Sequence, residues 1–438
     1  MEEFGVYPLI IAASLIIIAS FLFNEISKRT NIPSVLMLIV LGVVLKLSFA
    51  EKVGGIDFSY LLELLGIVGL IMIVLEAALE LKLSRDQLIP IGKSMLIAVA
   101  GLMLSAWVCK EILMYYYADA GMTSESAWLY ATPLSILSSA IIIPSVGGLR
   151  KDKKEFHIYE STFSDIFGII VFYFLTGPFD ALKTGIPAPG FVKYSGILVV
   201  TVILALLGSY LLVWVFQKLK SHVKLFLLIA VLLLEYAIGK TYHLSSLIII
   251  LVFGLMFANV NLFFGWWDPL KKLIQPKKIA EIFEGLHIVT LETAFVVRTF
   301  FFVIFGLTID PSSLLSGRVA VISILIIASI YIIRFILLRV FIGKDLLPQL
   351  FIAPRGLITV LLFNAIPGGA KFLGFEPGIL LFVIIGTSLI MTFSMIQDKK
   401  RAGSAIRKAE ESPVDLAIWS TPGVDMSGME SSEASSAH

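Results

Sequence analysis

The chain has 438 residues, of which 58% are hydrophobic and only 15% are charged. A soluble domain would carry roughly a quarter of charged residues, so this composition excludes an ordinary soluble protein. The formal net charge of +2 gives no basis for binding nucleic acid, and the single cysteine excludes an intramolecular disulfide or a cysteine-built metal site. Apolar runs of about twenty residues recur throughout, which predicts an all-α, polytopic membrane protein.

About thirteen apolar runs are long enough to cross a bilayer. They cover residues 5–23, 32–50, 57–81, 92–117, 127–149, 157–177, 192–216, 223–239, 244–264, 280–307, 317–341, 346–366 and 375–396. The tenth run is long and can also be read as two short helices. The acidic start, "MEEFGVY", lacks the basic region of a signal peptide, so the first run is expected to be a retained span. We predict a membrane domain over 1–396 and a short, disordered cytoplasmic tail over 397–438, where the sequence becomes polar.

Basic residues in the loops test this count of spans. Every odd-numbered span ends in a basic loop, as in "SKRT" (27–30), "RKDKKEFH" (150–157) and "DKKR" (398–401). The intervening loops contain fewer Lys and Arg, and "YADAGMTSES" (117–126) contains none. The positive-inside rule then places the N-terminus outside and the C-terminus in the cytoplasm of a cell, or inner, membrane.

The sixth apolar run contains two acids in the stretch "YESTFSDIFGII", residues 159–170. On a helix, Ser161, Ser164, Asp165 and Gly168 share one small, polar face. An acid near the bilayer centre costs about 2.5–3.5 kcal/mol on insertion scales, which makes a functional role plausible. The alternative is a carboxylate that only holds helices together, and this alternative has more weight for Glu160 than for Asp165.

Other charged residues within the predicted spans are candidate partners for these acids. Arg298 and Arg334 lie deepest among the basic ones and need a counter-charge, so pairing with deep carboxylates is the cheapest arrangement. The remaining candidates are Glu76, Glu80, Lys110, Glu111, Glu235, Glu292 and Arg355.

Proline and glycine interrupt the fifth and the twelfth span. These interruptions are Pro133, Pro144 and Gly147–Gly148 in the fifth span, and Pro348, Pro354, Gly356 and Pro367 in the twelfth. A simple kink is the alternative explanation, since proline is common in membrane helices. Two interrupted spans in corresponding places are typical of inverted repeats, whose broken helices cross at an ion site.

Several stretches, in this order, resemble motifs of the monovalent cation/proton antiporter superfamily, the Na+/H+ exchangers and their relatives. They are "NIPSVLMLIVLGVVL" (31–45), "LEAALELKL" (75–83), "ESTFSD" (160–165), "LIIILVFGLMFAN" (247–259), "FFFVIFGLTID" (300–310) and "PRGLITVLL" (354–362). The resemblance covers residues 5–395. It implies a homodimer in which a six-helix core moves against a dimerising panel to give alternating access.

The resemblance also implies roles for individual residues. Asp165 looks like the ion- and proton-binding aspartate, and Ser164 stands where the exchangers have asparagine. Glu160 looks like the acid that pairs with an arginine of the eleventh span, for which Arg334 is a better candidate than Arg339.

Three further residues are accessory candidates. Glu76 matches the glutamate of the family's third-span motif, and Arg355 is the arginine of the P-R-G motif. Arg298 is an alternative partner for Glu160.

One departure concerns the broken fifth span. Many relatives have Thr-Asp-Pro there, whereas this chain has Ile142-Ile143-Pro144. The stretch "LSSAII" instead resembles the potassium-efflux branch, so Ser138 and Ser139 are expected to supply oxygens to the cation, together with Ser161 and Ser164.

The function expected from these residues is exchange of protons for a monovalent cation, Na+ or Li+, with K+ as an alternative. Because one carboxylate binds either species, exchange should be one-for-one and electroneutral. No cofactor is expected, and the absence of a Walker motif argues against ATP-driven pumping. Alternatives are a potassium/proton efflux transporter, a channel or anion transporter on this scaffold, and a transport-impaired sensor. An intramembrane enzyme is disfavoured because no HExxH or protease-like pattern is present.

Overall fold

The computed structural model describes residues 6–30, 32–49, 59–83, 88–184, 191–219, 224–241, 246–264, 275–308, 313 and 316–411, and all regular elements within these ranges are helical. The α-helices are α1 (Val6–Thr30), α2 (Ser34–Ser48), α4 (Ser59–Glu80), α5 (Leu88–Tyr117), α6 (Ser124–Ser135), α7 (Ser139–Ser145), α8 (Lys151–Thr184), α9 (Phe191–Phe216), α10 (Lys224–Thr241), α11 (Ser246–Ala258), α12 (Val260–Phe264), α14 (Pro276–Thr308), α15 (Gly317–Phe341), α16 (Leu357–Asn364) and α17 (Gly378–Glu411). Short 3-10 turns are η2 (Val146–Gly148), η4 (Gln349–Phe351) and η5 (Gly368–Ala370).

The helices agree with the predicted spans. Among the described residues, nine helices are long and apolar enough to cross a membrane, and three shorter apolar helices accompany them. The chain is therefore a multi-pass membrane protein, while the count of thirteen spans stays a prediction.

The tenth run forms one helix, α14, rather than two short ones. The last helix, α17, continues to Glu411, so the first part of the predicted tail is helical; residues 412–438 lie outside the described residues.

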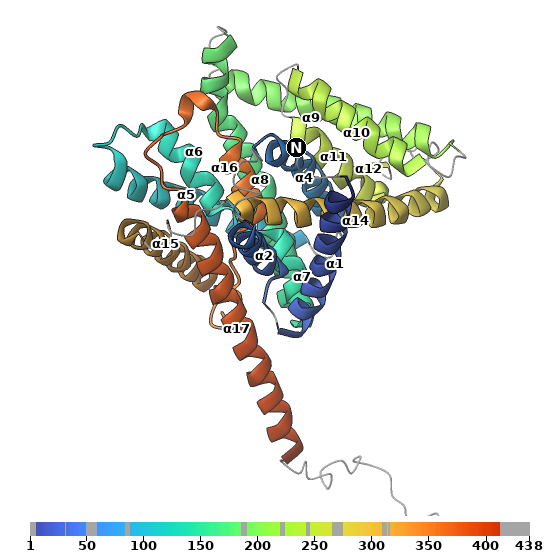
Figure 1. The fold of residues 1–438 in the computed structure, drawn as a ribbon. Coiled ribbons are helices and arrows are strands. Elements are labelled where there is room, and N and C mark those ends of the chain that lie inside the picture. Colours follow the sequence, from blue (N-terminus) through green and yellow to red (C-terminus); the bar gives the residue numbers. More distant parts are fainter. Residues whose placement is uncertain are drawn as a thin grey trace, which may run out of the picture. The chain divides into compact units, whose positions relative to one another are not determined.

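Within residues 1–395 the helices pack as two sets (Figure 1). The panel helices are α1, α2, α4, α9, α10, α11, α12 and α14, which pack mainly against one another. The core helices are α5, α6, α7, α8, α15 and α16. The start of α17 joins the core, because Thr387 accepts a hydrogen bond from the Arg355 backbone amide at 3.0 Å and its carbonyl lies 3.4 Å from the Tyr331 hydroxyl.

The backbones of α2 and α14 approach each other closely at Gly42 and Gly306. A Cβ atom on Gly42 would lie 2.8 Å from Gly306 Cα and would also collide with the carbonyl oxygen of Val303. Small residues at helix contacts allow such packing in membranes, where hydrophobic burial alone does not drive association.

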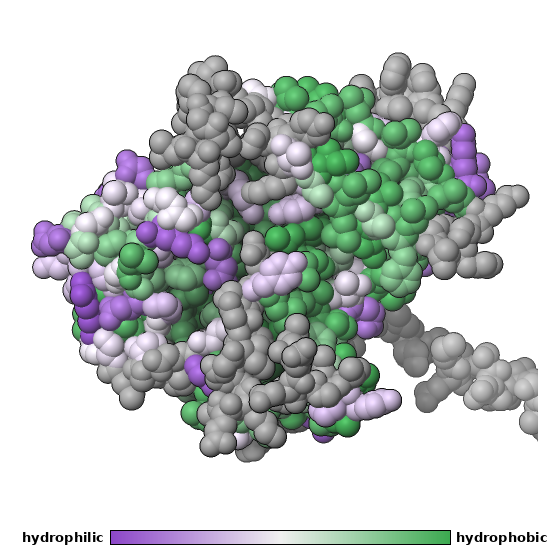
Figure 2. Space-filling model, turned by 45° about the horizontal axis from the view of Figure 1, so that its top comes forward, coloured by the Kyte–Doolittle hydropathy of each residue, from purple (hydrophilic) through white to green (hydrophobic). Residues whose placement is uncertain are grey.

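Apolar side chains also cover much of the outer surface. Figure 2 shows a broad area of hydrophobic residues on one face of the molecule. On α1, Ile10, Leu15 and Phe21 are each more than half exposed. A surface of this kind is expected where helices face lipid rather than water.

Candidate functional site

Two interrupted helices of the core cross each other at their breaks. The fifth span divides into α6 and α7, with residues 136–138 between them in non-helical conformation. The twelfth span contains η4, an extended stretch over 352–356, and α16. The backbone amide of Ser138 donates to the carbonyl of Pro354 at 3.0 Å, which joins the two breaks directly.

The prolines do not mark the first break as the sequence suggested. Pro133 and Pro144 both lie inside helices, in the last turns of α6 and α7. In the second break, Pro354 and Gly356 do lie in the extended stretch. A Cβ on Gly356 would collide with the Ser138 hydroxyl and lie 2.9 Å from Ile141 Cδ1, so glycine allows the crossing.

Asp165 lies on α8 beside this crossing and is 2% exposed. Ser139, the first residue of α7, is its polar neighbour, yet neither carboxylate oxygen accepts a hydrogen bond of standard geometry among the described residues. The carboxyl group lines a cavity of about 10 Å³, the lower limit for one water molecule. The cavity walls come from α4 and α11 of the panel and from α8 and α16 of the core, so Asp165 lies at the boundary between the two sets.

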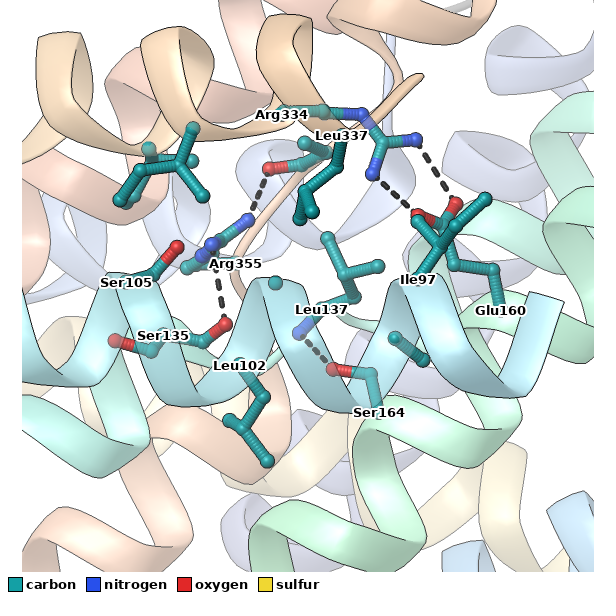
Figure 3. Close-up of a pocket in the computed structure, with 15 residues that line it drawn as sticks. Ile97, Leu102, Ser105, Ser135, Leu137, Glu160, Ser164, Arg334, Leu337 and Arg355 are labelled. Carbon is teal, nitrogen blue, oxygen red and sulfur yellow. Dashed lines mark hydrogen bonds and ion pairs between the residues drawn. The ribbon is translucent and has the colours of Figure 1, made fainter. Parts of the chain in front are cut away.

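Ser164 faces a different cavity, shown in Figure 3. Its hydroxyl oxygen accepts a hydrogen bond from the backbone amide of Leu137, at 3.0 Å, in the break between α6 and α7. This second cavity has a volume of about 30 Å³ and is also lined by Glu160, Arg334 and Arg355. It is large enough to hold a water molecule, and these polar side chains could bind one.

Glu160 and Arg334 form a bidentate ion pair between α8 and α15 (Figure 3). Arg334 Nη1 lies 2.6 Å from Glu160 Oε1, and Nη2 lies 2.9 Å from Oε2. The guanidinium also donates to the carbonyl of Gln349 in η4, at 3.0 and 3.1 Å. Both side chains are buried, and His157 Nδ1 lies 3.5 Å from Glu160 Oε2. Arg339, the poorer candidate, is exposed.

Arg298 lies elsewhere, paired with Glu76 across α14 and α4 at 2.8 Å. Both side chains are only partly buried, with 17% and 16% of their surface exposed. Glu76 is also a charged neighbour of Asp165 and of Glu80. The four charges of these two ion pairs are therefore neutralised within the panel or within the core, not across the boundary.

Arg355 is almost completely buried and has no carboxylate partner in the described structure. It donates to the carbonyls of Leu134 at 2.9 Å, Ser135 at 3.1 Å and Ala353 at 2.7 Å. Leu134 and Ser135 end α6, where carbonyl groups lack partners and the helix dipole favours a cation. The guanidinium therefore caps one broken helix from within the other.

The remaining predicted residues lie around the crossing in different roles. The Ser161 hydroxyl donates to the carbonyl of His157 at 2.7 Å, and Ser138 packs against Gly356. Where relatives have the Thr-Asp pair, Ile142 is fully buried and Ile143 is partly buried. The sequence did not indicate Thr387 or the Gln349 carbonyl as partners, because hydrogen bonds to buried hydroxyls and to backbone oxygens leave no pattern in the sequence.

Fold and site together define a helical membrane transporter with a buried carboxylate at the crossing of two broken helices. The family described as "Sodium/hydrogen exchanger, transmembrane" matches residues 11–397. The chain therefore belongs to this sodium/hydrogen exchanger family.

Individual relatives agree with this assignment. The structure is similar to that of the sodium proton antiporter MjNhaP1 from Methanocaldococcus jannaschii at pH 8, with a TM-score of 0.65, 18% identity, and coverage of 90% of this chain and 97% of the other. An electron-microscopy structure of the same antiporter gives a TM-score of 0.62 at 18% identity, with coverage of 95% and 100%. Identities this low show a shared fold alone.

A curated relative is the ammonium/H(+) antiporter subunit AmhT of Alkalihalophilus pseudofirmus. It is 29% identical over an alignment of 273 positions that covers 58% of this chain. The match spans 64% of the length of that relative.

Proposed function

We propose that the protein is a secondary active antiporter that exchanges protons for a monovalent cation by alternating access. The observation that carries the proposal is the state of the buried acids. Glu160 and Glu76 each have an arginine partner, whereas Asp165 lines a cavity and, among the described residues, has Ser139 beside it but no basic partner. Asp165 is therefore available to bind either a proton or a cation.

Competition at this one carboxylate supplies the mechanism. Burial favours the neutral, protonated form of a carboxyl group, and a bound cation favours the ionised form. If the site becomes accessible from the other side of the membrane only when a proton or a cation is bound, transport exchanges protons for cations. The cavity at Asp165 is bounded by both helix sets, so a movement of the core helices against the panel helices would open it to one side at a time.

Hard oxygen ligands suit Na+ and Li+, with K+ as an alternative. Ser138 and Ser139 at the start of α7 are proposed to add oxygens to the Asp165 carboxylate. Ammonium is a further candidate cation, because the relative from Alkalihalophilus pseudofirmus is named as an ammonium/H(+) antiporter subunit. We further propose that the protein acts as a homodimer in the cell membrane, with the N-terminus outside and the C-terminus in the cytoplasm, and that it needs no cofactor.

Exchange in vesicles tests this function. Acridine orange reports a pre-formed pH gradient in proteoliposomes, and we expect fluorescence to recover when Na+, Li+ or K+ is added. Ammonium requires a protein-free control, because ammonia crosses the bilayer unaided. Absence of recovery with every cation would support a sensor that has lost transport, and cation flux without proton flux would support a channel.

A further inference from the structure

An apolar groove runs along the boundary between panel and core, away from the Asp165 cavity. Its volume is about 510 Å³. Phe23 of α1, the outer face of α2, and Ile385 and Leu389 of α17 form its walls, and every lining side chain is apolar. Figure 1 shows α2 next to the first half of α17.

The length of the groove fits one leaflet of a bilayer. Lining residues on α2 extend from Leu36 to Val44. At 1.5 Å per residue this stretch rises about 12 Å, close to half of the roughly 30 Å hydrocarbon thickness. Val40 and Val44 are each at least half exposed, so the groove is open toward the surrounding lipid.

A basic residue precedes the groove closely along the chain, on the side of the loop between α1 and α2. Ile32 lines that side of the groove, and Arg29 lies three residues before it at the C-terminus of α1. The Arg29 side chain is 79% exposed, and its contact with Glu25 is long, at 3.9 Å. An exposed pair of this kind contributes little, so the guanidinium remains available to an anion.

We propose that the groove binds an acyl chain of an anionic phospholipid whose headgroup is held by Arg29. A second protein helix fits the site less well. The groove is bounded by both helix sets, and a rigid helix docked there would hinder the movement that the proposed function requires. A flexible acyl chain adapts to that movement, and in this respect the inference rests on the proposed function.

Lipid retention tests the headgroup contact without measuring transport. The purified protein is incubated with equimolar phosphatidylglycerol and phosphatidylcholine, and native mass spectrometry counts the lipids that remain bound. We expect a preference for phosphatidylglycerol that Arg29→Gln lowers about fivefold, the effect of one basic residue near an anionic headgroup. The matched control, Arg339→Gln, removes an exposed arginine outside the groove and should leave the preference unchanged. Equal preference in wild type and Arg29→Gln would overturn the headgroup assignment.

Filling the groove tests the acyl-chain contact. The double variant Val40→Phe/Val44→Phe should lose the retained phospholipid of either headgroup. Val321→Phe/Val340→Phe makes the same change at two exposed valines of α15 and should retain it. Equal retention in the two double variants would overturn the proposal. A change in oligomeric state confined to the groove variant, without loss of lipid, would overturn it as well, by identifying the groove as a protein contact.

Discussion

Ser164 and Asp165 are adjacent in the chain, yet they line two different cavities. The Asp165 carboxylate faces the boundary between panel and core, whereas the Ser164 hydroxyl binds the backbone of the break between α6 and α7. The sequence placed both residues on one small, polar face of α8, which is correct for their positions on the helix. It could not show that side chains 100° apart on that face reach different neighbours.

The first prediction concerns Asp165. Asp165→Asn keeps the size of the side chain but can neither hold a charge nor exchange a proton. It should reach the membrane in normal amounts and lose cation/proton exchange in proteoliposomes. Asp119→Asn, the same change in an exposed turn after α5, should retain wild-type exchange and serves as the control. Normal exchange by Asp165→Asn would refute the proposed site.

The second prediction separates a structural from a ligand role for Ser164. Ser164→Ala leaves the buried Leu137 amide without its acceptor, which costs about 1–3 kcal/mol. We expect a lower melting temperature in detergent but an unchanged cation concentration for half-maximal exchange. A shift in that concentration without loss of stability would instead make Ser164 a cation ligand.

The third prediction concerns the buried pair of Glu160 and Arg334. Removing one partner leaves a buried, unpaired charge, so Glu160→Gln and Arg334→Gln should each lose on the order of 3–5 kcal/mol of stability. The double variant should recover part of this loss. A parallel cycle of Glu160 with Arg298 should be additive, because Arg298 bonds Glu76. Additive losses for Glu160 and Arg334 would show that the pair does not form in solution.

At the scale of helices, apolar runs predicted the elements well, because each run of sufficient length must form helix to satisfy its backbone inside a bilayer. Breaks within helices were predicted less well. Pro133 and Pro144 continue their helices, while the first break falls at residues 136–138, which carry no proline or glycine. That break is stabilised by bonds from Leu137 to Ser164 and from Ser138 to Pro354, which are distant in sequence and therefore invisible to local patterns.

The fourth prediction tests helix contact within the panel. Gly42→Ala places a methyl group against the backbone of α14, where no side chain can move aside. Overpacking of this kind costs about 1–3 kcal/mol, so the variant should melt at a lower temperature in detergent. Gly196→Ala in α9, where no atom lies within 4 Å of the added carbon, should melt like the wild type. Equal melting temperatures for the two variants would show that α2 and α14 are packed less closely.

At the scale of the whole molecule, the distribution of charge between the helix sets suggests how the transporter can move. Glu76 and Arg298 neutralise each other within the panel, and Glu160 and Arg334 do so within the core. Arg355 is held by carbonyls of the core alone. Relative movement of the two sets therefore breaks none of these bonds, and Asp165 is the acid that we propose changes its charge with its cargo.

The fifth prediction follows from this arrangement: transport should be electroneutral and inhibited by acid. If Asp165 alone carries the exchange, it binds either one proton or one monovalent cation, so the site has the same net charge in both loaded states. A membrane potential should then drive no net flux. Protons compete with the cation for Asp165, so acid should inhibit, and raising the cation concentration should shift the activity profile to lower pH.

The measurement is Na+/H+ exchange in proteoliposomes whose potential is set by valinomycin and a K+ gradient. A parallel set without Na+ shows whether K+ itself is carried.

Glu160 is the residue that would change the outcome, because it would also titrate if Arg334 released it during the cycle. Arg334→Lys keeps the charge but cannot form the bidentate bond, so it should be the variant most prone to such release. A sustained pH change driven by potential alone, dependent on Na+ and absent in Asp165→Asn, would show that a second proton is carried. Such a change appearing only in Arg334→Lys would identify the buried pair as the device that keeps wild-type exchange at one proton per cation.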